Sequence, residues 1–140
     1  MTKMIFVSLP VNDLDASIRF YEAIGCVKNP QFSDENSAAM VWSETIHFML
    51  LNHKAYSTFV SKPIADSHAT SPMLIALSLD SREAVDSIVE TAAASGGKAD
   101  IRPANDMGFM YQRTFEDPDG NGFEPLWMNP EASFGEPDAA

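Results

Sequence analysis

The sequence contains an internal repeat, and this repeat limits the possible folds more than any other feature. Residues 6–13 (FVSLPVND) align with residues 74–81 (LIALSLDS), a shift of 68 positions, and each segment predicts a strand that leads into a capped helix. His47 aligns with Glu124 in the same way, a shift of 77 positions, near the end of each half. Neither half can bury its sheet face alone, so the repeat predicts two modules packed together.

Both halves predict the same order of elements: strand, helix, strand, strand, strand. The first module covers about residues 4–60 and the second about residues 72–130, and together they form a single domain over residues 1–140. Residues 131–140 predict a loosely held tail. We therefore expect an α+β fold in which two βαβββ modules form a curved mixed sheet around a cavity.

Composition excludes several classes of function. The chain has 140 residues and a net charge of −11, with 9 Lys and Arg against 20 Asp and Glu, so we expect no nucleic acid and no anionic membrane as a partner. Cys26 is the single cysteine, so no intrachain disulfide can form. The N-terminal residues lack the features of a signal peptide, and no apolar stretch reaches the roughly 18 residues of a membrane span. We expect a soluble cytoplasmic protein.

Two motifs carry a resemblance to a known superfamily. Residues 9–21 read LPVNDLDASIRFY and are followed by Gly25, and residues 115–124 read FEDPDGNGFE. Both motifs resemble the vicinal oxygen chelate superfamily, which includes glyoxalase I, bleomycin-resistance proteins and extradiol dioxygenases. Residues 107–113 (MGFMYQR) are similar to the bacterial glyoxalase-like, or lactoylglutathione lyase-like, subgroup. The resemblance implies the two-module fold.

The resemblance also implies where a catalytic metal would bind. Metal-dependent members of the superfamily hold a divalent ion with one ligand from the first strand and one from the last strand of each module. Those positions fall on Phe6 and Leu74 in the first strands, and on His47 and Glu124 in the last strands. Phe6 and Leu74 cannot bind a metal, so only His47 and Glu124 remain. We therefore expect no cofactor, with a divalent metal at His47 and Glu124 as the alternative.

Without a metal, His47 and Glu124 are still candidates for catalysis. A carboxylate beside an imidazole favours the imidazolium, and such a pair could serve acid–base chemistry or hold a polar group of a ligand. The other side chains that we expect to line the pocket are Phe6, Leu74, Met49, Met110, Tyr111, Gln112, Arg113 and Leu126.

The strand at residues 109–115 leaves one point open. Tyr111 and Arg113 share one face of this strand, and Met110 and Gln112 share the other, so one pair faces the cavity. If Arg113 faces the cavity it predicts anion binding; otherwise it predicts a surface salt bridge with one of the many carboxylates.

Three hypotheses of function follow. The leading one is a metal-independent protein that binds a small molecule, either to sequester it or to convert it in an unidentified reaction. The second is a metal-dependent lyase or dioxygenase of the same superfamily, and the third is a structural or partner-binding module. We expect a homodimer, because superfamily members often pair so that modules from two chains come together. The sequence does not tell whether modules pair within one chain or between two.

Overall fold

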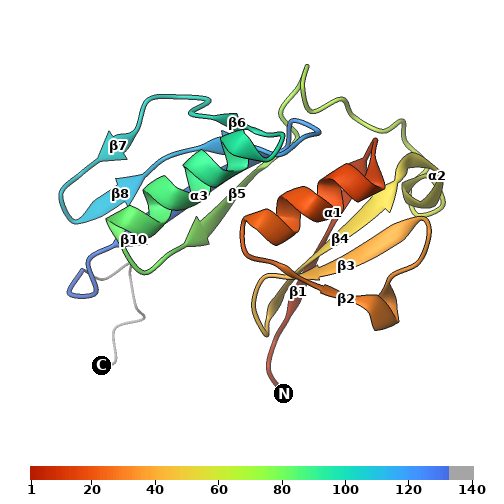
Figure 1. Ribbon diagram of the computed structural model, residues 1–140, viewed down its shortest axis with the longest axis horizontal. Helices are drawn as coiled ribbons and strands as arrows, with labels where there is room; N and C mark the ends of the chain where they lie inside the picture. Colours follow the sequence, from red (N-terminus) through yellow and green to blue (C-terminus); the bar gives the residue numbers. More distant parts are fainter. Residues whose placement is uncertain (133–140) are drawn as a thin grey trace.

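The protein is described by a computed structural model that covers residues 1–132 in detail (Figure 1). Residues 133–140, which make up most of the expected tail, lie outside the described residues. No helix in the described part of the chain is long and apolar enough to cross a membrane.

The first module has four strands and one long helix. Its elements, with a short helix that follows the last strand, are β1 (Ile5–Val11), α1 (Leu14–Ala23), β2 (Val27–Asn29), a 3-10 turn (Pro30–Phe32), β3 (Ser37–Val41), β4 (Ile46–Asn52) and α2 (His53–Tyr56). The strand order is β1-β4-β3-β2, with β1 parallel to β4 and the other pairs antiparallel. Helix α1 begins at Asp13, whose side chain accepts a hydrogen bond from the backbone N–H of Ala16.

The second module repeats this arrangement with shorter strands. Its elements are β5 (Leu74–Ser78), α3 (Arg82–Ala94), β6 (Lys98–Ala99), β7 (Asn105–Asp106), β8 (Met110–Gln112), β9 (Phe115–Glu116) and β10 (Gly122–Met128). β5 runs parallel to β10, as β1 does to β4. β8 and β9 pair with β10 in the same register, so they are two parts of one interrupted strand. The predicted α+β fold with two βαβββ modules is confirmed.

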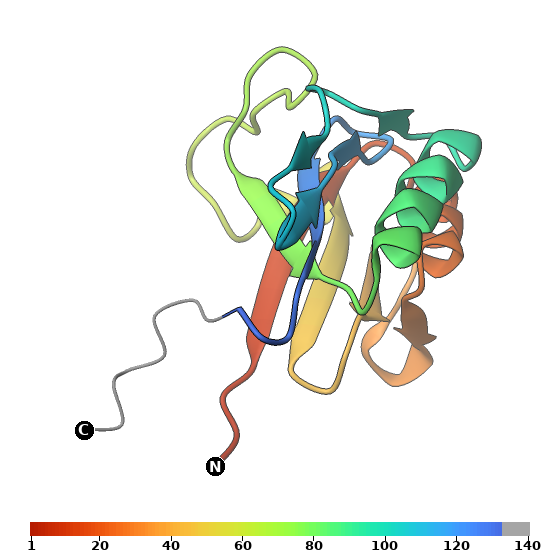
Figure 2. The same ribbon diagram turned by 90° about the vertical axis from the view of Figure 1, so that its left-hand side faces the viewer.

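Both long helices lie on the same side of the strands, and one hydrophobic core joins the two modules (Figure 2). The rings of Phe48 and Phe123 meet edge to face with their centroids 5.7 Å apart, and each belongs to a different module. Phe20 of α1 contacts Phe115 of the second module with its ring tilted by 51°, at a centroid distance of 6.1 Å. Aromatic pairs of this kind add to the free energy of burial, so neither module is complete without the other.

A polar contact between the modules lies beside this core. The turn at residues 117–121 of the second module packs against α1 of the first. Asp117 is 2% exposed, and its carboxylate accepts hydrogen bonds from the Tyr21 hydroxyl at 2.7 Å, from the Asn121 side chain at 2.9 Å, and from the backbone N–H groups of Asp119 and Asn121. Burial raises the pKa of the Asp117 carboxyl, while the hydrogen bonds from Tyr21 and Asn121 act against that rise. These donors replace the water that the buried carboxylate has lost.

The next acidic residue of the turn makes a second contact with the first module. Asp119 accepts hydrogen bonds from the backbone N–H of Asn12 at 2.9 Å and from the Asn12 side chain at 3.0 Å. Its other oxygen accepts from the Ser17 hydroxyl at 3.3 Å. The turn therefore fixes the start of α1 relative to the second module.

We expect Tyr21→Phe to lower the free energy of unfolding by about 1.5–3 kcal/mol, because it removes a donor from a buried carboxylate. Urea denaturation followed by circular dichroism measures this loss. Tyr56→Phe is the matched control, since it removes the same hydroxyl from α2 and leaves the Tyr21–Asp117 hydrogen bond in place. An unchanged stability in Tyr21→Phe would contradict the role given to this hydrogen bond.

Candidate functional site

The strand faces opposite the helices form the candidate site, which we call the open face. Alternation along each strand decides which side chains lie there. On β1, Leu9 and Val11 are buried toward the core, whereas Phe6 is 58% exposed on the open face. On β10, Phe123 is buried in the core and Glu124 has the opposite orientation. The open face thus carries many of the residues predicted from the sequence: Phe6, His47, Met49, Leu74, Met110, Gln112, Glu124 and Leu126.

Phe6 and His47 form a stacked pair on the open face of the first module. They are directly opposite each other in the β1–β4 register, and their ring centroids lie 4.7 Å apart with an angle of 17° between the planes. The His47 Nε2 atom lies 3.2 Å from the carbonyl oxygen of Glu44 and donates to it in the tautomer that this contact favours. The pair offers a flat, partly apolar surface.

Glu124 on the open face of the second module is held by an arginine. The Arg102 Nη2 atom lies 2.6 Å from Oε2 of Glu124 and donates to the Gln112 side-chain oxygen at 3.0 Å. The Glu124 side chain is 18% exposed and the Arg102 side chain 39%. The ion pair is therefore partly shielded from water, while the guanidinium can still be reached from outside.

The strand register corrects one detail of the repeat. Glu124 is opposite Ala76 on β5, and Leu74 is opposite Gly122. The residue of β5 that lies opposite Glu124, as Phe6 of β1 lies opposite His47, is thus Ala76. It is two residues beyond the predicted Leu74. Neither side chain offers an atom that binds a metal.

The residues of this face do not fit the metal site of metal-dependent relatives. Arg102 already supplies a positive charge beside Glu124, and a divalent cation there would be repelled by the guanidinium. His47 stacks on Phe6 and bonds the Glu44 carbonyl through Nε2. Among residues 1–132, no three His, Cys, Asp or Glu side chains come together in an arrangement that could hold a metal ion.

Tyr111 and Arg113 point to the opposite side of the sheet from Gln112, toward α3. The Tyr111 hydroxyl donates to Asp86 at 2.6 Å, and the Arg113 guanidinium lies within 3.0 Å of Asp86, Glu90 and Asp100. The hydrogen bonds that the Arg113 guanidinium donates to Asp100, Glu90 and Asp86 raise its pKa above its usual range. Of the two roles that the sequence left open for Arg113, the structure shows the salt bridge, and the face with Met110 and Gln112 is the open one.

Met49 also belongs to a separate hollow of about 390 Å³ between β4 and α2, which Leu51, Lys54 and Phe59 line as well. Arg102 is the residue of the open face that the sequence did not single out. The sequence gives only a weak signal for Arg102, which is that it is one of two basic residues after position 99.

Comparisons with known proteins agree with this geometry. The family model of the Glyoxalase/Bleomycin resistance protein/Dioxygenase superfamily matches residues 3–124. The chain therefore belongs to this superfamily. A search among curated proteins finds no match.

Several solved structures share the fold at low sequence identity. A hypothetical protein from S. aureus is 22% identical with a TM-score of 0.76, and the match covers 91% of this chain and 95% of that one. A glyoxalase/bleomycin resistance protein/dioxygenase family enzyme from Burkholderia phytofirmans is 20% identical with a TM-score of 0.74, covering 91% and 99%. The fosfomycin resistance protein FosX from Mesorhizobium loti is 16% identical with a TM-score of 0.65, covering 91% and 92%. At these identities the similarity shows the fold alone.

Proposed function

We propose that this chain is a metal-independent member of its superfamily that binds a small molecule on the open face, to sequester it or to convert it in an unidentified reaction. The observation that supports this most is the ion pair between Arg102 and Glu124. It engages the carboxylate that would otherwise be the best metal ligand of this face.

The chemistry of the open face suggests what such a molecule would contain. Phe6 and His47 offer a stacked aromatic surface, and the flexible side chain of Met49 can adapt to different apolar shapes. Arg102 and Gln112 can donate to polar groups, because the guanidinium has five N–H groups and its contacts with Glu124 and Gln112 engage one nitrogen. A planar or apolar compound that carries hydrogen-bond acceptors matches this combination. FosX, among the similar structures, is named for resistance to fosfomycin, which is itself a small molecule.

We also propose a homodimer, in which the open faces of two chains meet and shield the bound molecule from water. The exposed apolar side chains at the start of β1, including Phe6, support this arrangement. Light scattering should give about twice the chain mass of 15.3 kDa at micromolar concentration. The mass of a single chain would contradict the dimer.

A thermal-shift screen tests binding directly. Planar aromatic compounds with carboxylate, amide or phenol groups, including aromatic antibiotics, are screened in excess EDTA. We expect some of them to raise the Tm of the wild type in EDTA, and Arg102→Met to weaken their binding by about tenfold, the effect of losing one charge-assisted hydrogen bond. Arg19→Met is the matched control, because Arg19 is exposed on α1.

Two results would contradict the proposal. One is a thermal shift that appears only when a divalent metal is added. The other is equal binding by wild type and Arg102→Met. Because Arg102→Met leaves Glu124 without its cation, the double variant Arg102→Met with Glu124→Gln keeps the test valid if the single variant unfolds.

A further inference from the structure

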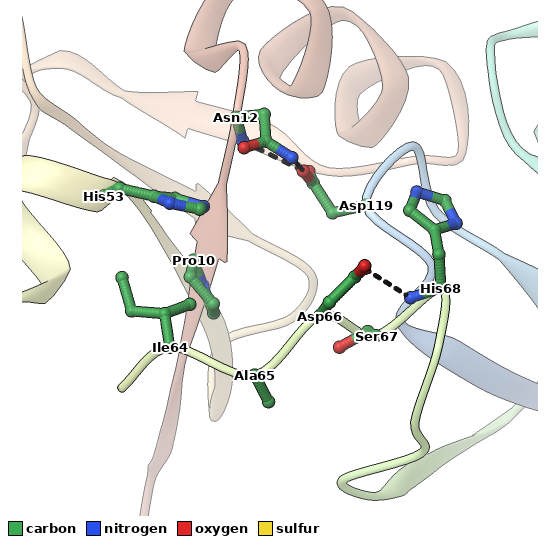
Figure 3. Close-up of a pocket in the computed structure, with 9 residues that line it drawn as sticks. All are labelled: Pro10, Asn12, His53, Ile64, Ala65, Asp66, Ser67, His68 and Asp119. Atoms are coloured by element: carbon green, nitrogen blue, oxygen red, sulfur yellow. Dashed lines mark hydrogen bonds between the residues drawn. The ribbon is translucent and has the colours of Figure 1, made fainter. Parts of the chain in front are cut away.

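The segment between the two modules, residues 57–73, which we call the linker, lies beside two adjoining hollows. A polar hollow of about 360 Å³ opens between the end of β1 and the turn at residues 117–121 (Figure 3). An apolar hollow of about 220 Å³ adjoins it. Both are lined by Pro10, Ile64, Ala65 and Ser67, so the two hollows are immediate neighbours with chemically different linings. We call the two together the linker cleft.

The linker is held against the second module at defined points. The Ser67 hydroxyl donates to the Asn121 side-chain oxygen at 3.1 Å, and His68 Nε2 lies 3.1 Å from the Pro118 carbonyl oxygen. Gly120 has a φ of +85°, and a Cβ atom there would lie 2.7 Å from the backbone nitrogen of His68. Glycine is therefore required for the linker to approach the turn this closely. The linker, held in this way, forms a fixed wall of the cleft.

Carboxylates dominate the polar hollow. Asp66 and Asp119 both line it, and no Lys or Arg does so among the residues that the structure describes. Asp119 is already occupied by Asn12 and Ser17. Asp66 is exposed, and only its Oδ1 atom is used, by the His68 backbone N–H at 3.0 Å. Its second oxygen is left to accept a hydrogen bond from a molecule in the hollow.

One imidazole faces this hollow and a second is held at its edge. The His53 ring points into the hollow from the start of α2, whereas His68 lies on the opposite side beside Asp119, with its Nε2 atom 3.1 Å from the Pro118 carbonyl oxygen (Figure 3). A neutral imidazole offers one acceptor nitrogen, so the His53 ring can receive an N–H donor alongside the Asp66 carboxylate. The polar end of the cleft therefore suits a group that donates several hydrogen bonds and carries a positive charge.

The other end of the cleft is apolar. Tyr56, Val60, Pro72 and Met73 line it, and Lys62 also lines this hollow but not the polar one. An aryl or alkyl group placed here would leave water, and the Lys62 ammonium can remain in solvent at the end of its apolar stem.

We propose that the linker cleft is a second binding site, apart from Arg102 and Glu124, that takes a small amine with an apolar tail. The ammonium group binds Asp66 on the side of the hollow that faces His53, and the tail fills the hollow lined by Tyr56 and Val60. The net charge of −11 favours the approach of a cation over that of an anion.

Three probes of similar size separate charge from shape: 2-phenylethylamine, 2-phenylethanol and 3-phenylpropionate. Their binding is followed by two-dimensional NMR titration of the full chain. We expect saturable shifts with the amine at the amides of residues 64–68, and binding at least about tenfold weaker for the alcohol and the acid. Asp66→Asn should weaken amine binding by a similar factor while it keeps the acceptor for the His68 N–H. Glu35→Gln, which removes an exposed carboxylate before β3, should leave amine binding unchanged.

Equal affinity for the amine and the alcohol would overturn the proposal, as would equal amine binding by wild type and Asp66→Asn. Amine shifts that map away from the linker, or no binding at millimolar amine, would overturn it as well. Arg102→Met should leave amine binding unchanged, because Arg102 does not line this cleft. The site at Arg102 and Glu124 and the site under the linker can therefore fail independently.

Discussion

The buried contact between the 117–121 turn and α1 is the interaction on which the rest of the structure depends. Asp117 accepts hydrogen bonds from Tyr21 and from its own turn, and Asp119 accepts from the backbone at the start of α1. The same turn holds the linker through His68 and Asn121. One short segment thus fixes the first helix, the second module and the connection between them.

Because the helical sides of both sheets are used to join the modules, the opposite sides remain free for function. Two arginines of the second module, Arg113 and Arg102, lie on different sides of its sheet. Arg113 is surrounded by three carboxylates on the helical side, so it contributes to packing. Arg102 lies on the open face, where its partner Glu124 is shielded and its own guanidinium can be reached. The position of each arginine relative to the sheet decides its role.

The repeat predicted the two modules because strand and helix periodicities are local properties of the sequence. It missed the exact register, since the alignment relied on the helix caps at Asp13 and Ser81, whereas pairing is decided across the strands. In the first module the residue opposite His47 is Phe6, and in the second module the residue opposite Glu124 is Ala76. The stretch from Ala76 to the start of α3 is two residues shorter than the stretch from Phe6 to the start of α1. Helix caps therefore could not place Ala76 opposite Glu124.

The contact between Arg102 and Glu124 could not be predicted from the sequence, for a different reason. Asp100, between β6 and Arg102, has a φ of 55°, in the left-handed region that Asp adopts more readily than most residues. This conformation breaks the alternation of a strand, so the face on which Arg102 lies cannot be deduced by counting residues. The backbone N–H of Arg102 instead donates to the Thr114 hydroxyl at 3.3 Å. The site therefore rests on a backbone turn that no motif indicates.

The metal content of untagged protein purified without chelator tests the central claim most directly. It is measured by elemental mass spectrometry for the wild type and for Glu124→Ala. We predict far less than one transition-metal ion per chain in both proteins, because Arg102 neutralises Glu124 and neither Phe6 nor Ala76 can supply a ligand. Near-stoichiometric metal in the wild type that disappears in Glu124→Ala would contradict it.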